Sequence, residues 1–415
     1  PCGKSHTRKG VVEVGKNQTP SDSNNVRWES SADTMTAQPL NEPILGYSPG
    51  SPERNSIIQE IDRQMSETIE IPCIINGEEV FTGHTIPQVI PHNHGHILAN
   101  VHLAGRKEME SACSAAVNAQ RSWIEMGLEE RCKIFEKCAD LLAGDWRMRV
   151  NASTMLNQSK TVFQAEIDSA CELIDFWRFN CHYARGFHDD FQPLVSPEGV
   201  VNSTDIRPLE GFVLSITPFN FTSIAANLPS APAIVGCTSV WKPSRNSYYS
   251  NYYLMRLMME AGLPPGVINF LPGSGAEITE VALSNPNFAG LHFTGSTATF
   301  QGLWQEIGLA LPKLNSYPRI VGETGGKDFV VAHPDCDRRG LVVALLRGAF
   351  EYQGQKCSAA SRAYIPRSVW EEISDELSDE IGKIAMGDAR DFTNFMTAVI
   401  DKRAFDKISG YIQRA

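Results

Sequence analysis

The sequence predicts an α/β protein built around a doubly wound parallel sheet. From residue 211 onward, short apolar runs alternate with helix-like stretches, which is the order of elements in such a sheet. The runs that have the length of buried strands are residues 211–216, 238–241, 267–271 and 291–294. With 415 residues, of which 42% are hydrophobic, the chain is long enough for two or three domains with buried cores.

The first 210 residues are expected to hold helices and one hairpin. Residues 1–39 are polar and aperiodic, and we interpret them as a disordered arm. Residues 71–81 alternate around the pair Asn76-Gly77, which indicates a β-hairpin. Helical spacing of apolar residues occurs in four stretches. The first begins near Ser56, and the other three cover residues 107–126, 129–142 and 164–187.

A second α/β segment begins near Arg319. Its strands are expected at residues 320–323 and 329–332. Its helices are expected at residues 335–350, 369–384 and 402–414.

Composition excludes several classes of protein. A net charge of −11 argues against a nucleic-acid binder, which usually carries a basic excess or a basic stripe. Ten cysteines without a C-x-x-C motif indicate free thiols in a reducing compartment rather than a disulfide framework. The longest uncharged stretch, residues 211–241, is long enough to cross a membrane, but prolines interrupt it and we expect no membrane span.

Three histidines, His92, His94 and His96, stand at alternate positions. Histidine clusters can bind zinc, but no cysteine or carboxylate nearby completes a set of ligands. We therefore expect no metal site.

Cys357 is the strongest candidate for a nucleophile. It stands in the polar loop QGQKCS, residues 353–358, after a predicted helix. A thiolate attacks an aldehyde carbon readily and leaves well from a thioester. Most cysteines taken alone are inert buried thiols, but a position between lysine and serine in a glycine-containing loop is unsuited to a core.

Two further polar side chains follow predicted strands. Glu323 precedes the glycines of ETGGK, and a carboxylate there can act as a general base toward water. Asn220 lies in the stretch TPFNF after the strand at residues 211–216, where its amide can donate to an oxyanion. Taken alone, each residue fits an ordinary turn equally well.

Polar residues at other strand ends indicate a cofactor site. Lys242 lies in WKPS, and Gly295 and Ser296 lie in FTGS, each after a predicted strand. Ligands of open α/β sheets bind at the carboxyl ends of strands. Lys242 can there hydrogen-bond ribose hydroxyls, and a helix that begins at Ser296 favours a pyrophosphate. The ordinary dinucleotide fingerprint G-x-G-x-x-G is absent from the sequence.

Taken in order, the motifs resemble those of the aldehyde dehydrogenase superfamily. The series is PFN, WKPS, GLPPGVIN, FTGS, ETGGK and GQKCS. Phe300 matches the Δ1-pyrroline-5-carboxylate (L-glutamate γ-semialdehyde) dehydrogenase branch, because most of the superfamily has a glycine there. Five more stretches resemble this branch: NEP at residues 41–43, GSPER at 50–54, NHGH at 93–96, QAEID at 164–168 and FEY at 350–352. The resemblance covers residues 40–415.

The resemblance implies an aldehyde dehydrogenase-like fold with two domains. Residues 40–318 would form a Rossmann-type NAD-binding domain that includes the N-terminal helices and the hairpin. Residues 319–415 would form an incomplete α/β catalytic domain that carries the cysteine nucleophile.

The resemblance also implies roles for individual residues. Cys357 attacks the aldehyde, Asn220 and the Cys357 N–H hold the oxyanion, and Glu323 activates water to hydrolyse the thioester. The NAD site is lined by Thr217, Lys242, Gly295, Ser296, Thr297, Ala298 and Thr299. Positions near the substrate are Glu172, Phe221 and Ser358.

The implied function is the NAD-dependent oxidation of glutamate semialdehyde to L-glutamate in proline catabolism, by a homodimer in the mitochondrial matrix. Family members continue past Ala415, so we expect this chain to lack part of the pocket and to show little activity and poor solubility. Two alternatives stay open. One is an inactive form that binds only NAD or a full-length partner, and the other is an aldehyde dehydrogenase for simple aldehydes, against which Phe300 and Glu172 argue.

Overall fold

The computed structural model describes residues 38–193 and 195–414. The N-terminal arm expected over residues 1–39 lies, up to residue 37, outside this part of the chain. From Asn41 onward the chain forms one compact unit, so the domain boundary expected at residue 319 stays a prediction.

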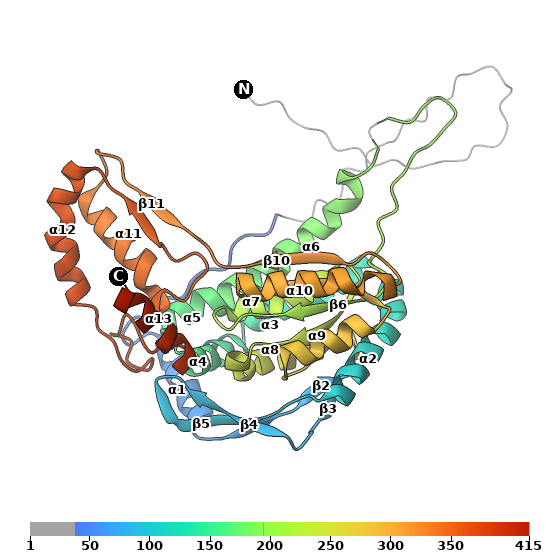
Figure 1. Ribbon diagram of the computed structural model, residues 1–415, viewed down its shortest axis with the longest axis horizontal. Coiled ribbons are helices and arrows are strands. Elements are labelled where there is room, and N and C mark those ends of the chain that lie inside the picture. The colour runs from blue at the N-terminus through green and yellow to red at the C-terminus, as the bar shows by residue number, and fades with distance from the viewer. Residues whose placement is uncertain (1–37, 194, 415) are drawn as a thin grey trace. The chain divides into compact units, whose positions relative to one another are not determined.

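A seven-stranded sheet runs through this unit in the order β10-β9-β6-β7-β8-β2-β3 (Figure 1). Five neighbouring strands are parallel, and β2 and β3 extend the sheet as an antiparallel hairpin. The strands are β2 (Cys73–Ile75), β3 (Glu78–Val80), β6 (Phe212–Ile216), β7 (Thr238–Lys242), β8 (Ile268–Phe270), β9 (Phe288–Thr294) and β10 (Arg319–Glu323). The predicted doubly wound α/β fold and the hairpin at Asn76-Gly77 are confirmed.

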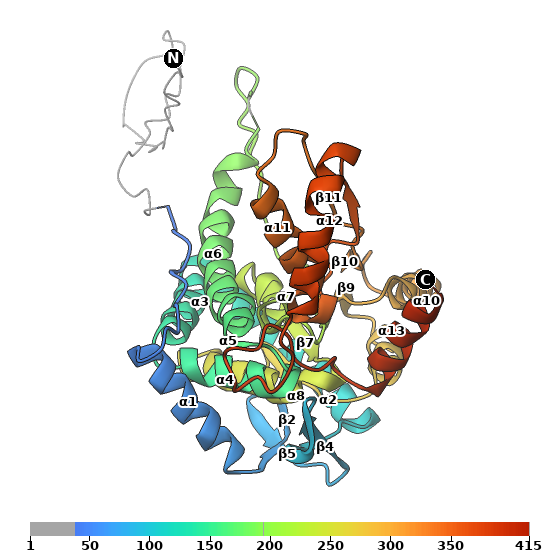
Figure 2. The ribbon, with the colours of Figure 1, turned by 90° about the vertical axis from the view of Figure 1, so that its left-hand side faces the viewer.

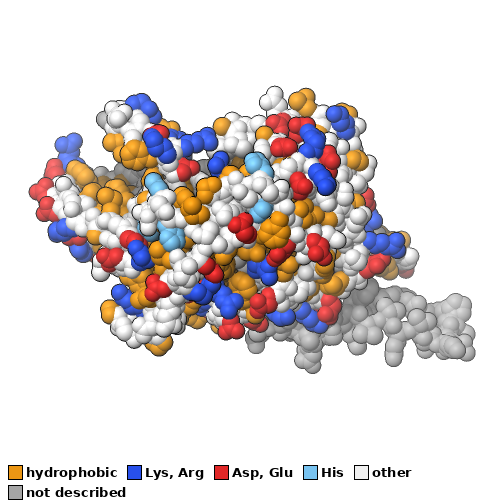
Figure 3. All heavy atoms as spheres, turned by 90° about the horizontal axis from the view of Figure 1, so that it is seen from below, with side chains coloured by type: hydrophobic (Ala, Val, Ile, Leu, Met, Phe, Trp, Pro, Cys, Tyr) orange, Lys and Arg blue, Asp and Glu red, His pale blue; other side chains and the backbone are white. Residues whose placement is uncertain are grey.

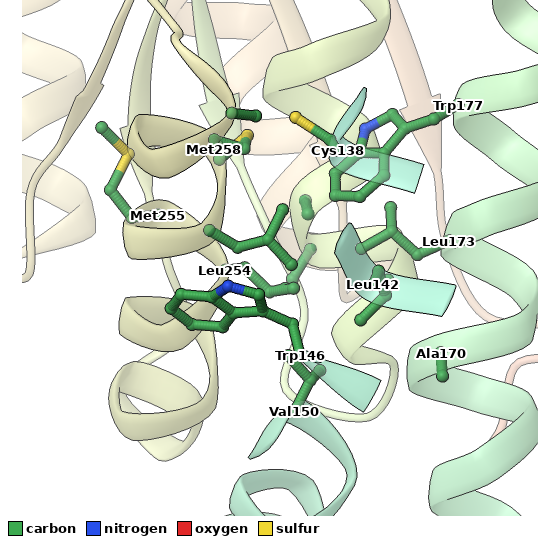
Figure 4. Close-up of a cluster of buried hydrophobic side chains, with 14 of the residues drawn as sticks. Cys138, Leu142, Trp146, Val150, Ala170, Leu173, Trp177, Leu254, Met255 and Met258 are labelled. Carbon is green, nitrogen blue, oxygen red and sulfur yellow. The ribbon is translucent and has the colours of Figure 1, made fainter. Parts of the chain in front are cut away.

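Helices cover both faces of the sheet, and each face has its own core. One core joins β6 and β9 to α2 (Arg106–Glu125), α9 (Gly275–Ser284) and α10 (Thr297–Ala310). The other core lies among α3 (Leu128–Ala143), α4 (Arg147–Gln158), α6 (Glu172–Asp190), α7 (Thr222–Ile234) and α8 (Tyr248–Ala261). Figure 4 shows Leu142, Leu173 and Leu254 from three of these helices meeting in the second core.

A continuous helical rod leads into α6. It begins with α5 (Val162–Ala165) and continues through the π-helical turn η1 (Glu166–Cys171). The extra residue per turn in η1 directs Glu166 and Asp168 inward, where both are buried. Glu166 accepts hydrogen bonds from the Tyr47 hydroxyl at 2.6 Å and from the amide of Asn151 at 2.8 Å, and it pairs with Arg147.

A second, three-stranded sheet contacts α4 and α8, and the N-terminal helix α1 (Pro52–Met65) packs on α4. The sheet consists of β1 (Ile69–Ile71), β4 (Thr85–Ile90) and β5 (Asn93–His102). The sequence did not predict this sheet. On the face seen from below in Figure 1, acidic and basic side chains are interspersed (Figure 3).

The segment after β10 forms a small separate layer. The parallel pair β11 (Phe329–Val331) and β12 (Arg362–Tyr364) lies with α11 (Arg338–Phe350) and α12 (Arg367–Gly382), which pack side by side (Figure 2). The last helix is α13 (Lys402–Arg414), and the 3-10 turn η4 (Glu351–Gly354) follows α11.

The structure differs from the expectations for this segment at three points. β10 was expected to begin the second segment, but it pairs in parallel with β9 and forms the edge of the seven-stranded sheet. The short strand β12 was not expected, because its three residues are all exposed and have no apolar pattern. Helix α11 begins at Arg338 rather than at residue 335, because the Asp337 side chain caps it by accepting from two backbone N–H groups.

No helix in the described ranges is both long enough and apolar enough to cross a membrane.

The start of β6 generates a prediction about stability. Gly211 has φ of +130°, and a Cβ there would lie 2.0 Å from the carbonyl oxygen of Asn287. We expect Gly211→Ala to lower the free energy of unfolding by about 2–3 kcal/mol, because both the backbone and its neighbour must shift. The matched control is Gly302→Ala within α10, where a Cβ meets nothing within 4 Å. This substitution should raise the free energy of unfolding by about 0.5–1 kcal/mol, because alanine favours the helix over glycine. Urea unfolding midpoints measure both, and equal midpoints for the two variants would contradict the close approach.

Candidate active site

The parallel sheet brings four predicted site segments to one edge. Thr294 at the end of β9 is level with Glu323 at the end of β10, and Ile216 at the end of β6 is level with Lys242 of β7. Because parallel strands point the same way, their carboxyl ends meet at the same edge of the sheet. The chain runs from β6 outward through β7 and β8 and then returns to β9 on the other side of β6. The edge therefore contains a switch point between β6 and β9, which is where ligands of such sheets bind.

Cys357 reaches this edge from outside the sheet. It follows α11 and η4, and its Sγ donates to Oε1 of Glu323 at 3.5 Å. The ETGGK glycines make the approach possible, because a Cβ at Gly326 would lie 2.0 Å from the carbonyl oxygen of Cys357. The Asn220 amide donates to the carbonyl of Gln355 at 2.9 Å, two residues before the cysteine. The structure thus brings together the three predicted catalytic residues.

The environment of Cys357 keeps its thiol protonated. Burial raises the pKa of Cys357, and the neighbouring charge and hydrogen bond of Glu323 raise it further. The thiol is therefore neutral near pH 7, and the carboxylate that accepts its hydrogen bond stands ready to accept its proton.

A cavity of 440 Å³ opens beside the Sγ of Cys357. All three predicted substrate residues, Glu172, Phe221 and Ser358, line it. Ser223 donates to Glu172 at 2.5 Å, and burial raises the pKa of Glu172. Further lining residues that the sequence did not indicate are Phe176, Ile224, Asn227, Leu228 and His292.

One feature of the sequence distinguishes His292 from its neighbours. It is a polar residue inside β9, whose other positions are apolar, small or a terminal threonine. Its Nδ1 lies 2.9 Å from the carbonyl oxygen of Leu228, and burial lowers the pKa of His292. A neutral imidazole therefore forms part of the cavity wall next to Glu323.

A buried charge cluster lies beneath the cysteine loop. Lys160 is fully buried, and its Nζ lies 2.5 Å from Asp168, which is also 3.2 Å from Nζ of Lys356. The rings of Phe221 and Tyr352 each lie 4.5 Å from the Lys160 ammonium. Burial lowers the pKa of Lys160 to about 8, and the adjacent carboxylate of Asp168 opposes this shift. Single-sequence patterns cannot reveal such a cluster, because its members come from separate elements.

The residues predicted to bind NAD fit that cofactor. Lys242 lies at the end of β7, where burial lowers its pKa to about 8, and among the described residues it has no ion-pair partner. A buried cation without a partner is unfavourable, and ribose hydroxyls or phosphate oxygens would supply one. Thr217 is buried beside it and accepts a hydrogen bond from the Trp241 indole at 3.0 Å.

Helix α10 presents its N-terminus at the same edge. Ser296 caps the helix by accepting from the Thr299 N–H at 3.2 Å, and Gly295 precedes it. Thr297 and Ala298 are the first two residues of this helix, where backbone N–H groups have no intrahelical partner and can bind a pyrophosphate. All seven predicted cofactor residues therefore lie on this edge of the sheet.

Phe300 is held against β10. Its ring stacks on Phe293 with centroids 5.6 Å apart, and a Cβ at Gly322 would lie 2.1 Å from the ring. The Phe300 ring therefore occupies the space that a side chain at Gly322 would need.

Of the three alternate histidines, His92 lies between β4 and β5, and the other two, His94 and His96, lie on β5. His92 lies 2.8 Å from the Ser159 hydroxyl and 3.2 Å from Asp388. No three His, Cys, Asp or Glu side chains within residues 38–193 and 195–414 are grouped to hold a metal ion.

Comparisons with known proteins agree with this geometry. The profile described as "Aldehyde dehydrogenase family" matches residues 80–415. A Δ1-pyrroline-5-carboxylate dehydrogenase of Agaricus bisporus is 48% identical over 377 residues, which are 90% of this chain and 69% of that protein. A mitochondrial Δ1-pyrroline-5-carboxylate dehydrogenase of Homo sapiens is 42% identical over 391 residues, which are 94% of this chain and 69% of that protein.

A solved structure shares the fold. The Δ-pyrroline-5-carboxylate dehydrogenase from Mycobacterium tuberculosis, bound with NAD, aligns with a TM-score of 0.89 and 49% identity. The alignment covers 93% of this chain and 72% of that one.

The raised pKa of the Cys357 thiol predicts how alkylation by iodoacetamide depends on pH. Only the thiolate reacts, so the rate should rise as pH increases through the raised pKa. Glu323→Gln removes the charge that raises this pKa and should move the profile to lower pH. Glu172→Gln is the matched control, since Glu172 lines the same cavity and is not among the groups that shift the thiol. Rates come from mass spectrometry of the Cys357 peptide, and a profile that does not move in Glu323→Gln would refute the coupling.

Proposed function

Because this chain belongs to the aldehyde dehydrogenase family, we propose that it oxidises L-glutamate γ-semialdehyde to L-glutamate with NAD. The aldehyde is in equilibrium with Δ1-pyrroline-5-carboxylate, and the reaction belongs to proline catabolism. One observation carries the assignment. The Cys357 thiol lies 3.5 Å from the Glu323 carboxylate, and both residues line a cavity that Glu172 and Ser358 also line.

Cys357 acts first, as the nucleophile. Glu323 takes the proton of the thiol, and the thiolate sulfur adds to the carbonyl carbon of the aldehyde. The oxygen becomes an oxyanion, which the Cys357 N–H and the amide of Asn220 stabilise. One N–H of that amide donates to Gln355, so the other is free to point at the oxyanion.

When bound, NAD supplies the acceptor for the hydride that leaves the former aldehyde carbon. Lys242 and the first turn of α10 would hold the cofactor at the switch point between β6 and β9. Loss of the hydride leaves a thioester on Cys357.

Glu323 passes the thiol proton to solvent, and the resulting carboxylate then acts as the general base in hydrolysis. It takes a proton from water, the hydroxide oxygen attacks the thioester carbon, and Cys357 leaves as a thiolate. The released product is a carboxylic acid, so atoms and electrons balance.

Glu172 and Ser358 determine which aldehyde enters. The substrate carries an ammonium and a carboxylate, which need charged and polar partners once they leave water. Glu172 suits the ammonium, the Ser358 hydroxyl suits the carboxylate, and Phe221 packs on the aliphatic part. A simple aldehyde has no ammonium group that could pair with a buried carboxylate such as that of Glu172.

Location and assembly are further proposals. Curated relatives that include those of Homo sapiens and Dictyostelium discoideum are named as mitochondrial, which supports a mitochondrial location for this protein, and within it we propose the matrix. We also propose a homodimer, which light scattering at micromolar concentration would test.

The two half-reactions can be separated with Glu323→Gln. An amide cannot take a proton from water, but removing the Glu323 charge lowers the pKa of the Cys357 thiol, so solvent can still take the thiol proton in this variant. Glu323→Gln should therefore release one equivalent of NADH in a burst and then turn over at least about 100-fold more slowly. Stopped-flow absorbance of NADH measures both phases. Cys357→Ser is the control and should show neither phase while still binding NAD. Wild-type steady-state turnover in Glu323→Gln would remove Glu323 from hydrolysis.

Substrate preference depends on Glu172. We expect Glu172→Ala to reduce kcat/KM for glutamate semialdehyde by about 10- to 100-fold, while kcat/KM for propanal changes little, because the ammonium loses its partner. Glu172→Gln, which keeps the shape of the side chain, should behave like Glu172→Ala if charge matters. Equal losses on both aldehydes would show that Glu172 serves structure instead.

A further inference from the structure

The backbone just before Cys357 is held in an unfavourable conformation. Tyr352 has φ 50° and ψ 40°, and Gln353 has φ 56° and ψ 28°. Gly354 continues the left-handed turn with φ 68°. Two successive residues that carry a Cβ rarely adopt this region, because Cβ crowds the carbonyl oxygen. Contacts from elsewhere must therefore hold the turn.

Gln353 makes one set of these contacts. Its Oε1 accepts from the N–H of Thr397 at 3.2 Å. Its Nε2 donates to Oγ1 of Thr397 at 3.1 Å and to the carbonyl of Ala398 at 2.5 Å. The amide is thus bound in both directions by a segment 44 residues further along the chain.

Gln355 makes the second set and extends it to the oxyanion site. Its Oε1 accepts from the N–H of Ile400 at 3.0 Å, and its backbone carbonyl accepts from Asn220 at 2.9 Å. The same residue is therefore held by the distant segment on one side and orients the Asn220 amide on the other. We call Gln353, Gln355 and residues 397–400 the glutamine clamp.

The distant half of the clamp is itself anchored to the body of the protein. Thr397 donates through its hydroxyl to the carbonyl of Ser159 at the end of α4. Asp401, directly after the clamp, accepts from the amide of Asn246 at 2.7 Å. Tyr352 adds a buried hydrogen bond from its hydroxyl to the carbonyl of Gln158, 2.9 Å away. The turn is therefore fixed relative to the sheet rather than only to its own helix.

We propose that Gln353 and Gln355 are positioning residues for the catalytic pair Cys357 and Asn220. The clamp holds the left-handed turn so that the thiol faces Glu323 and the Asn220 amide keeps one N–H free for the oxyanion. Neither glutamine touches the reacting atoms. This inference rests on the proposed dehydrogenase function for its kinetic consequence, but its structural core concerns only the thiol.

Gln353→Met tests the clamp with a side chain of similar length that makes no hydrogen bonds. A turn that relaxes moves the thiol away from its partner, and small displacements of that kind cost about 10- to 100-fold in rate. We expect kcat to fall by that factor while KM for NAD changes less than about twofold, since the cofactor contacts are elsewhere.

Gln120→Met is the matched control. Gln120 also binds the backbone in both directions, since it accepts from the N–H of Gly211 at 3.1 Å and donates to the carbonyls of Leu209 and Gly211. It lies on α2, away from the cysteine loop. Its loss should lower the melting temperature but leave kcat unchanged. An equal fall of kcat in both methionine variants would reduce the clamp to ordinary structural support.

Two conservative pairs give rescue tests. Gln355→Glu keeps the acceptor for the Ile400 N–H and should retain most activity, whereas Gln355→Leu should not. Thr397→Ser keeps the hydroxyl that Gln353 and Ser159 use, whereas Thr397→Val loses it. If Gln353→Met does not fold, unchanged kcat in Thr397→Val would overturn the proposal by itself.

The alkylation of Cys357 by iodoacetamide provides a readout that does not need turnover. In the otherwise wild-type protein, Glu323→Gln should shift the pH profile of Cys357 alkylation to lower pH. In the Gln353→Met background the same substitution should shift it less than half as far, because thiol and carboxylate no longer face each other. A full shift in that background would overturn the proposal. A wild-type protein that does not oxidise glutamate semialdehyde would refute the proposed function. The pH profiles of Cys357 alkylation would still test whether the clamp positions the thiol.

Discussion

The alignment of β6, β9 and β10 in one parallel sheet is the constraint on which the site depends. Because these neighbouring strands end at the same edge, residues that are about 100 positions apart in the chain meet there. Asn220 follows one strand, Ser296 follows the next and Glu323 ends the third. A single change of register would move these groups by one residue spacing, about 3.3 Å, which exceeds the length of a hydrogen bond.

The nucleophile is supplied by a different part of the protein, and the loop that carries it adopts an unfavourable backbone conformation. Cys357 comes from the layer of α11 and η4, so its distance from Glu323 depends on how that layer is held against the sheet. The loop uses backbone conformations that are unfavourable by about 1–2 kcal/mol per residue. Long-range hydrogen bonds offset that cost, such as the one from the Tyr352 hydroxyl to the carbonyl of Gln158, and they make the geometry a property of the whole fold.

The rod of α5, η1 and α6 links stability to function through its acidic residues. Glu166 binds the N-terminal segment and Arg147, Asp168 binds two lysines beneath the cysteine loop, and Glu172 reaches the cavity. Removing one partner from such a buried pair leaves an uncompensated charge, which typically costs about 3–5 kcal/mol. The π turn allows three acids so close in sequence to serve three separate environments.

The sequence by itself determined the fold class, the family and the identity of the residues that meet at the site. Apolar runs of strand length reported the parallel sheet, and ordered motifs identified Cys357, Glu323 and Asn220. These signals are local, because strand burial and glycine-rich turns depend on neighbouring residues. Only the tertiary structure placed β10 in the central sheet, paired β11 with the short strand β12 and revealed the roles of Lys160, His292 and the two clamp glutamines. Those features depend on contacts between residues up to 238 positions apart, and no periodicity in a single sequence records such contacts.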